Sequence, residues 1–301
     1  MNASGNDASL EVIIPVKDRF EVLQCVESLA RIDAKVAKVI VCDGGSTDAQ
    51  CLEALKKLQR QNNVQVLQFQ TPGFNKSMLF NKGIEQARSE FLLISDADIL
   101  WSEAALNALL NKVRSDANTI CYIREVEESI PSSVARKRDR YTYKVRVTAR
   151  VAFIDIVSEG TCLHRPGCGL ICAKKSTLIA LGGYKEIFSG WGWEDQDLLI
   201  RASLFGIQVR ADGGVMHLSH SDKARNRHHD NVAPIRTRNR NIIACLKSLS
   251  EGVLKGNLQL SSVSQPKLKP IHFRLPSSLM EACIKDNLPG IPELVNMSDE
   301  L

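Results

Sequence analysis

The sequence has no run of about eighteen consecutive apolar residues, the length that a membrane-spanning helix needs. Its first nine residues are polar and lack the basic start and apolar stretch of a secretory signal peptide. Both absences favour a cytoplasmic protein, with peripheral association at the inner face of a membrane as a further option. We expect residues 1–9 to be disordered.

A framework of cysteines that bind zinc or form disulfides is not indicated either. The nine cysteines are an odd number spread from Cys25 to Cys283, and none forms a CxxC pair. Cys168 and Cys172 have three residues between them, which is a poor match to zinc-site spacing. We expect free thiols in an apolar core, as is usual in a reducing compartment.

Charge is not concentrated in one sign. The formal net charge is +5, which is a modest bias towards anionic partners and too small to indicate nucleic acid. The 301 residues, 44% of them apolar and 24% charged, are enough for one large α/β domain or two small ones. We find no internal repeat.

Apolar runs typical of buried strands alternate with helical patterns through the first hundred residues. Such alternation predicts an α/β fold with a mostly parallel sheet that is flanked by helices. Ligands in these folds sit outside the carboxyl ends of the strands. The expected strands are residues 10–16, 37–42, 64–69 and 90–95, and the expected helices are residues 20–30, 48–58, 75–88 and 102–114.

The alternation becomes irregular after residue 114. Tyr141 to Val151 alternates apolar with polar residues, which predicts a half-exposed strand. Its polar face is basic and continues the charges of residues 136–140, so that it is either a solvated face or a contact for an acidic partner or a membrane surface. From Gly252 onwards the sequence is polar and spaced by prolines, and we expect a loosely packed C-terminal extension over residues 251–301.

Asp96-Ala97-Asp98 directly follows one of the apolar strands. Two carboxylates one residue apart suit a hard divalent cation that bridges a diphosphate. The ion would neutralise the charge that builds up on a diphosphate leaving group. A plain turn or helix cap explains the motif equally well when it is taken alone.

Asp43-Gly44-Gly45-Ser46 follows the second strand in the same way. Asp43 is placed to accept hydrogen bonds from a base or a ribose, and the glycines let the backbone approach a ligand. A tight turn that caps the next helix is the simpler interpretation, and the two are compatible.

The segment Gly190-Trp191-Gly192-Trp193 runs into Glu194-Asp195-Gln196-Asp197. Three acidic groups in four positions are costly to bury unless they are used. A helix start explains the carboxylates through the helix dipole, but it does not explain the two tryptophans. Glycine-flanked Trp191 is typical of a mobile aromatic platform for a sugar face.

His217 and His220 follow a short apolar stretch. Two imidazoles three residues apart reach one metal ion from a turn or a helix. Exposed histidines without a ligand are commoner, so the pair gains weight only from its context.

The order of these motifs resembles a GT-A-fold glycosyltransferase of the family 2 type. The second half resembles the C-terminal region of the β-1,4-galactosyltransferases of family 7 and of the chondroitin polymerases. The resemblance covers roughly residues 10–225 and is supported by three further segments. These are Ile14 to Arg19, Phe74-Asn75-Lys76 with Asn81 following, and Gly182-Gly183-Tyr184.

The resemblance implies a GT-A (Rossmann-like) domain over residues 10–250, with a nucleotide half over about 10–100 and an acceptor half over about 101–250. It implies Mn²⁺ or Mg²⁺ as the cofactor, a UDP-sugar as the donor and a glycan or lipid-linked saccharide as the acceptor. The implied roles, by residue, are metal ligands at Asp98, His217 and His220, a catalytic base at Asp195 with Glu194 orienting hydroxyls, and nucleotide-sugar contacts at Pro15, Val16, Arg19, Asp43, Asn75, Lys76, Asp96 and Trp191.

Three positions depart from the pattern of the family. Gly44 stands where family 2 usually has a second aspartate, so base recognition is expected to differ. Trp193 stands where a smaller residue is common and is expected to narrow the acceptor site. His217 stands where animal galactosyltransferases have methionine, and histidine there should favour tighter binding of a divalent metal.

We therefore expect an inverting, metal-dependent transfer of a hexose-type sugar to an acceptor hydroxyl. A sugar nucleotidyltransferase is the alternative enzyme, but its glycine-rich loop is missing after the first strand, where Pro15 to Arg19 stand instead. A non-catalytic glycan- or polyanion-binding module that uses the basic face of residues 141–150 is the non-enzyme alternative. No Ser-His-Asp arrangement suggests a covalent nucleophile.

Overall fold

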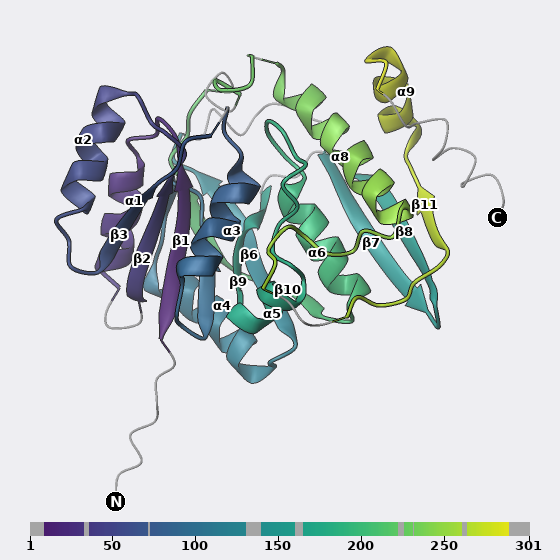
Figure 1. Cartoon of the computed structure of the whole chain (residues 1–301), viewed down its shortest axis with the longest axis horizontal. Helices are drawn as coiled ribbons and strands as arrows, with labels where there is room; N and C mark the ends of the chain where they lie inside the picture. The colour runs from purple at the N-terminus through teal and green to yellow at the C-terminus, as the bar shows by residue number, and fades with distance from the viewer. Residues whose placement is uncertain are drawn as a thin grey trace, which may run out of the picture.

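The computed structural model describes residues 9–32, 36–71, 73–130, 140–159, 165–221, 226–230, 232–260 and 264–288. Two β-sheets lie side by side, and helices cover them (Figure 1). Among the described residues, no helix is both long and apolar enough to cross a membrane. The predicted disordered N-terminus lies outside these ranges except for Ser9, whose hydroxyl is 2.9 Å from that of Ser89.

The first part of the chain folds as the alternation predicts. Each expected strand and helix is present, with ends that differ by one or two residues from the expected bounds in most cases. In order, the elements are β1 (Leu10–Val16), α1 (Val22–Ala30), β2 (Val36–Asp43), α2 (Ala49–Leu58), β3 (Val64–Gln68), α3 (Lys76–Gln86), β4 (Phe91–Ile94), β5 (Ile99–Leu100) and α4 (Glu103–Ser115).

The large sheet has the strand order β3-β2-β1-β4-β9-β6-β10-β5. It adds β6 (Thr119–Glu128), β9 (Arg165–Lys174) and β10 (Gln208–His217) to the strands above. The β3-β2-β1-β4 strands are parallel, β6 and β10 are parallel, and β9 runs antiparallel between β4 and β6. The sheet is mixed and is connected through helices, so that the predicted α/β fold class is confirmed.

Strand β1 is buried on both faces, which explains its unbroken apolar sequence. Val12 and Ile14 belong to one apolar core, and Ile13 belongs to the core on the opposite side of the sheet. Helix α3 lies on the Ile13 side, and a Cβ at Gly83 would overlap the Ile13 side chain. Glycine therefore allows α3 to pack closely on the sheet.

A smaller sheet carries β7 (Arg140–Thr148), β8 (Val151–Glu159) and β11 (Ile271–Arg274). Helices α6 (Glu194–Leu204), α8 (Pro234–Ser250) and α9 (Ser277–Lys285) share an apolar core with it, whereas α5 (Lys175–Ala180) contributes to the large-sheet core (Figure 1). The expectation of a loosely packed C-terminal extension is wrong for residues 264–288. Ile271, Phe273 and Leu279 are at most 5% exposed within this core, because β11 pairs with β8 and α9 packs beside it, whereas Ile284 of α9 is exposed.

Candidate active site

Strand register brings Asp98, His217 and His220 together. Strand β10 pairs antiparallel with β5, so that His217 lies opposite Ile99, the residue after Asp98. Oδ2 of Asp98 is 3.5 Å from Nε2 of His217 and 3.4 Å from Nε2 of His220. One ligand atom from each residue lies within 4.8 Å of the others, which is close enough for one metal ion.

Glu128 is a part of this site that the sequence did not reveal. Strand β6 pairs parallel with β10 and places Glu128 opposite His217, whose Nδ1 is 2.6 Å from Oε2 of Glu128. Arg165 and the Ser219 hydroxyl also donate to this carboxylate. Burial alone would raise the pKa of Glu128, but the hydrogen bond and charge of His217 lower it to about 2. Glu128 therefore stays ionised and orients the imidazole.

The donor set fits a divalent transition-metal ion. Two imidazole nitrogens and one carboxylate oxygen converge, and the second nitrogen of His217 is held by a carboxylate, as is usual for metal-bound histidine. Mg²⁺ prefers oxygen ligands alone and fits less well. Burial alone would raise the pKa of Asp98, but hydrogen bonds from His217 and His220 and the charge of His217 hold it well below its usual range.

Arg19 and Lys76 are two cations that lie among these acidic groups. Nη2 of Arg19 is 2.6 Å from Oδ2 of Asp98. Nζ of Lys76 is 2.6 Å from Oδ1 of Asp96 and 3.3 Å from Oε1 of Glu194. Burial alone would lower the pKa of Lys76, but the two carboxylates raise it, so that the ammonium stays charged.

Asp195 stands beside this cluster at the N-terminus of α6, directly after Glu194. A Cβ at Gly169 would lie 3.3 Å from Oδ2 of Asp195 and 3.7 Å from Nζ of Lys76. Burial and the charge of Glu194 raise the pKa of Asp195 to about 7. Oε2 of Glu194 is buried and has no hydrogen-bond partner in the described structure. The site thus holds one carboxylate able to exchange a proton near neutral pH and one free acceptor.

Apart from Trp191, the residues predicted to bind the nucleotide sugar lie at or just after the carboxyl ends of β1, β2 and β4 or at the start of α3, but several are engaged in the fold. The side chains of Pro15 and Val16 are buried. Oδ1 of Asp43 accepts hydrogen bonds from the backbone N–H and the hydroxyl of Ser46, which caps a turn. Asn75 caps α3 at Met78. Their contacts with a nucleotide stay predictions.

Position 44 has little room for the aspartate that family 2 usually has there. A Cβ at Gly44 would lie 3.1 Å from Cδ1 of Leu79, 3.4 Å from Oγ1 of Thr71 and 3.5 Å from Cδ2 of Phe74. A longer side chain would displace at least one of these neighbours. Glycine at position 44 therefore allows these three side chains to pack closely against the backbone.

The two tryptophans of the acidic segment lie in different surroundings. Trp191 is partly exposed and stands between two glycines with positive φ. Trp193 is 2% exposed, has a left-handed φ of 81° and packs in the core under the small sheet. The expectation that Trp193 narrows the acceptor site is therefore wrong. Its size serves the core that α6 shares with α8.

Asp197, the third acidic residue of the segment, forms a buried ion cluster. Its carboxylate is 2.7 Å from Nε of Arg201 and 3.3 Å from Nζ of Lys185, and none of the three side chains is more than 2% exposed. Arg201 also donates to the carbonyls of Leu181 and Gly183. Asp197 therefore has a structural partner and is poorly placed to act as a base.

The basic strand predicted at residues 141–151 is β7 as far as Thr148, whereas Val151 already begins β8 beyond a turn. Tyr141, Tyr143 and Val145 pack on the second core, so the predicted alternation holds over these residues. Lys144 and Arg146 are exposed, and Val147, at 43% exposed, breaks the alternation. Arg146 is 3.9 Å from Asp155 across the hairpin. The basic residues 136–138 lie outside the described residues.

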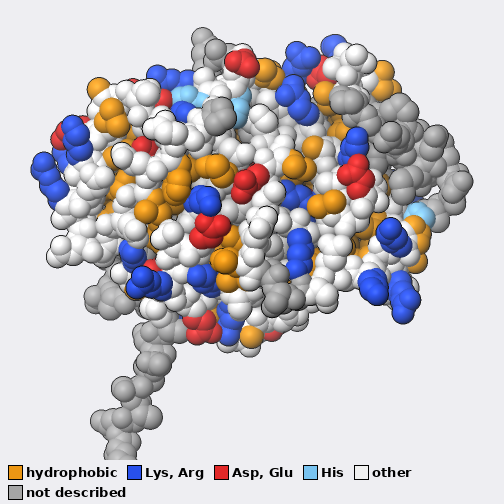
Figure 2. Space-filling model, viewed as in Figure 1, with side chains coloured by type: hydrophobic (Ala, Val, Ile, Leu, Met, Phe, Trp, Pro, Cys, Tyr) orange, Lys and Arg blue, Asp and Glu red, His pale blue; other side chains and the backbone are white. Residues whose placement is uncertain are grey.

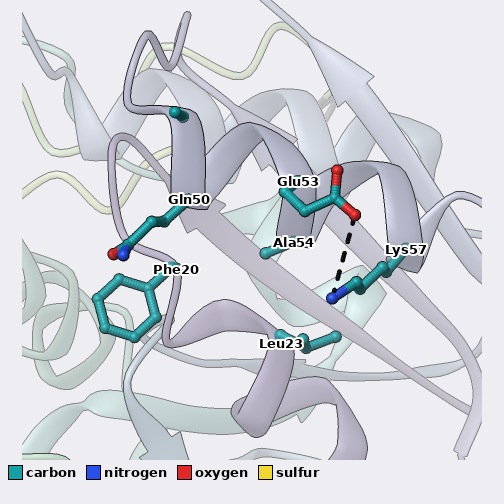
Figure 3. A pocket seen from close by; sticks show the side chains of 7 residues that line it. Phe20, Leu23, Gln50, Glu53, Ala54 and Lys57 are labelled. Atoms are coloured by element: carbon teal, nitrogen blue, oxygen red, sulfur yellow. Dashed lines mark ion pairs between the residues drawn. The ribbon is translucent and has the colours of Figure 1, made fainter.

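A shallow pocket of about 400 Å³ lies between α1 and α2, and none of its lining residues belongs to the groups around Asp98 and Lys76. Figure 3 shows Phe20 and Leu23 facing Gln50 and Ala54, with the Glu53–Lys57 ion pair at its rim. It carries no group suited to chemistry. Figure 2 shows basic and acidic side chains interspersed over the viewed face, in line with the small net charge.

Solved structures of glycosyltransferases share this fold. The mannosyltransferase PcManGT from Pyrobaculum calidifontis, in complex with GDP-Man and Mn²⁺, has a TM-score of 0.55 at 13% identity, covering 96% of this chain and 79% of that chain. GalNAc-T7 with UDP, GalNAc and Mn²⁺ has a TM-score of 0.56 at 14% identity, covering 71% and 44%. S. aureus TarS has a TM-score of 0.53 at 16% identity, covering 84% and 67%. These similarities identify the fold as GT-A.

Family models give the same assignment from the sequence. One described as glycosyl transferase family 2 matches residues 11–160, and one described as the N-terminal domain of galactosyltransferase matches residues 161–223. The chain is therefore a glycosyltransferase whose first half matches family 2 and whose second half matches the galactosyltransferases, which confirms the resemblance.

Curated relatives are distant and longer. Chondroitin sulfate synthase 3 of Mus musculus is 23% identical over 233 residues, and that of Homo sapiens is 25% identical over 235 residues. Each match covers 71% of this chain but only 25% of the relative. The chain thus spans about a quarter of the length of the curated relatives it matches.

Proposed function

We propose that this glycosyltransferase moves a hexose-type sugar from a UDP-sugar to a hydroxyl of a glycan or a lipid-linked saccharide, with inversion at the anomeric carbon. The observation that carries the proposal is the meeting of two clusters. One is the set of Asp98, His217 and His220, and the other is the group of carboxylates around Lys76. The short Asp96-x-Asp98 spacing joins them.

Asp98, His217 and His220 would hold Mn²⁺, and two of the fold neighbours were solved with Mn²⁺ and a nucleotide or nucleotide sugar. When bound, the ion would stabilise the negative charge of the departing diphosphate. Arg19 and Lys76 supply two further positive charges at the same edge of the sheet. Both are suited to contact phosphate oxygens, because donor binding lets them exchange a carboxylate partner for a phosphate.

Asp195 acts as the general base in this proposal. It removes the proton of the acceptor hydroxyl while that oxygen attacks the anomeric carbon, and the bonding electrons of the sugar–phosphate bond pass to the leaving UDP. A single displacement of this kind inverts the anomeric configuration. Glu194 orients a donor or acceptor hydroxyl through its unpaired Oε2.

A panel of UDP-sugars with Mn²⁺, scored by release of UDP, tests the function. We expect turnover with at least one donor, its loss in EDTA and its return on addition of Mn²⁺. NMR of the product should show the anomeric configuration opposite to that of the donor. Full activity in EDTA would remove the metal assignment, and retained configuration would remove the single displacement.

The remaining partner predictions concern the acceptor and the place of action. The exposed Lys144 and Arg146 of β7 support an acidic glycan or an anionic membrane surface as a contact. Cytoplasmic location with peripheral membrane association remains a prediction, which cell fractionation at low and high salt tests.

A further inference from the structure

The Gly190-Trp191-Gly192 loop is held by side chains from beyond both family matches. The matches end at residue 223, whereas the partners of the loop are Asn226 and two residues of helix α8, Thr237 and Asn241. Each of these three side chains is 2% exposed. Buried amides and hydroxyls are costly unless they are paired, and here the loop supplies the partners.

Both backbone polar groups of Trp191 are engaged. Oδ1 of Asn226 accepts a hydrogen bond from the Trp191 N–H at 3.0 Å. The Thr237 hydroxyl lies 3.0 Å from the Trp191 carbonyl oxygen and donates to it, sharing its one hydrogen with the Pro234 carbonyl. Nδ2 of Asn226 donates to Oγ1 of Thr237 at 3.2 Å, so that the two holding side chains also hold each other.

Asn241 fixes the two ends of the loop. Its Nδ2 donates to the Gly192 carbonyl at 2.7 Å, and its Oδ1 accepts from the Ser189 N–H at 3.3 Å. Gly190 and Gly192 have φ angles of +74° and +100°, and a Cβ at Gly190 would lie 2.6 Å from Cγ2 of Thr237. Glycine is needed for both the conformation and the close approach to α8.

The same segment also reaches the nucleotide half of the domain. Nε2 of His228 is 3.4 Å from Oδ2 of Asp18, which follows β1, and Nε2 of His229 is 3.1 Å from the carbonyl of Phe74, which precedes α3. Residues 226–230 therefore connect the Trp191 loop with the crevice at the ends of the parallel strands.

We infer that Asn226, Thr237 and Asn241 are positioning residues that hold Trp191 as a preformed wall of the sugar site. This differs from the mobile platform that the glycine-flanked sequence predicts, because buried side chains of the chain itself pair with the loop backbone. A preformed wall removes the cost of ordering the loop on binding. The inference rests on the proposed function only where it places a sugar beside Trp191.

Hydrogen exchange of the peptide that spans residues 189–193 tests the inference without an activity assay. In the free protein the amides of Ser189 and Trp191 should exchange slowly, and UDP with Mn²⁺ should change their rates by less than about threefold. Fast exchange in the free protein that slows by more than about tenfold with UDP and Mn²⁺ would show a closing lid and overturn the inference. These limits on the exchange rate follow from the strength of one hydrogen bond, whose loss shifts the equilibrium between the closed and the open loop by about five- to tenfold.

Two substitutions at Thr237 separate the effect of its hydroxyl from the effect of the shape of its side chain. Thr237→Val should speed exchange at Trp191 about five- to tenfold, and Thr237→Ser, which keeps the hydroxyl, should behave as wild type. Trp191 also gives a spectroscopic signal, because Trp101 and Trp193 are 5% and 2% exposed and iodide reaches them poorly. Iodide quenching should rise in Thr237→Val only.

Ser248→Ala is the matched control. Ser248 is a buried hydroxyl on the same helix, which pairs with Lys185 instead of the loop. It should lower the melting temperature and leave the exchange of residues 189–193 unchanged; equal loosening of the loop would reduce Thr237 to a general role in stability and overturn the inference.

Transfer kinetics give the last readout. Thr237→Val should raise the KM for the sugar substrates more than it lowers kcat, whereas equal kinetics for the Val and wild-type proteins would contradict a positioning role. If wild type transfers no sugar from any UDP donor, the proposed function fails, while the exchange result still decides whether the loop is preformed.

Discussion

Oε2 of Glu128 lies 2.6 Å from Nδ1 of His217, and this contact leaves Nε2 of the same ring facing Asp98. The carboxylate keeps a proton on Nδ1, so that Nε2 is the nitrogen that would give up its proton and bind a metal ion. Glu128 and His217 are separated by 89 positions in the chain, and the parallel pairing of β6 with β10 makes them neighbours.

Glu128→Gln should weaken Mn²⁺ binding by roughly 10- to 100-fold, the usual effect of losing such a partner of a metal-bound histidine. Titration calorimetry with Mn²⁺ in the absence of nucleotide measures it. Glu127→Gln is the matched control, because Glu127 is the exposed neighbour on the same strand. Equal affinities for the two variants would show that His217 does not need the contact.

Asp195→Asn should remain folded and bind UDP, and its transfer rate should fall by about 10² to 10⁴, the usual contribution of a general base. The amide keeps the shape of the side chain but cannot accept the proton. Measuring the melting temperature, UDP affinity and kcat on one preparation separates chemistry from folding. Near-normal turnover would place the base elsewhere.

The pH profile follows from the pKa of Asp195, which burial and Glu194 raise to about 7. Only the ionised carboxylate accepts a proton, so that kcat/KM should fall about tenfold per pH unit below that value and level off above it. A steady-state pH series on wild type measures this, and Asp195→Asn should lose the acidic limb. A profile that stays flat from pH 5 to pH 8 would contradict the assignment.

Asp43→Ala should weaken UDP binding, since its carboxylate stands at the carboxyl end of β2. The same substitution also removes the turn contacts to Ser46, so Ser46→Ala is needed beside it. Ser46→Ala keeps the backbone contact to Asp43 and loses the hydroxyl, which also accepts a hydrogen bond from the Asp18 N–H; it should bind UDP as wild type does. If calorimetry shows equal losses for both variants, Asp43 serves the turn alone.

Asp197→Asn should destabilise the fold by about 3 to 5 kcal/mol, because it leaves the buried charges of Arg201 and Lys185 without their partner. Denaturant unfolding measures the loss. Asp116→Asn, at the C-terminal end of α4 on the surface, is a control expected to change stability by less than about 0.5 kcal/mol. A small effect at Asp197 would mean that the cluster is easily solvated.

The sequence by itself determined the α/β class and the position of most elements in the first part of the chain. Strands such as Leu10–Val16 are buried on both faces and therefore read as unbroken apolar runs. Parallel strands have their carboxyl ends at one edge of the sheet, where ligands bind. The sequence alone therefore placed the motifs at Asp43 and Asp96 at this edge. The spacing of His217 and His220 likewise marked them as a pair.

Local patterns could not tell which distant groups would meet. The sequence segment from Trp191 to Asp197 looked like one functional unit, but packing sends Trp193 into the core and Asp197 to Arg201. The C-terminal segment looked polar and loose, yet its few apolar residues complete the core under the small sheet.

Only the tertiary structure decided that Glu128 orients His217 and that Asn226 holds Trp191. Both contacts depend on strand register and helix packing between segments far apart in the chain, and neither leaves a periodic trace in the sequence. The identity of each chemical group is local information, whereas its partner is set by the free energy of packing the whole chain.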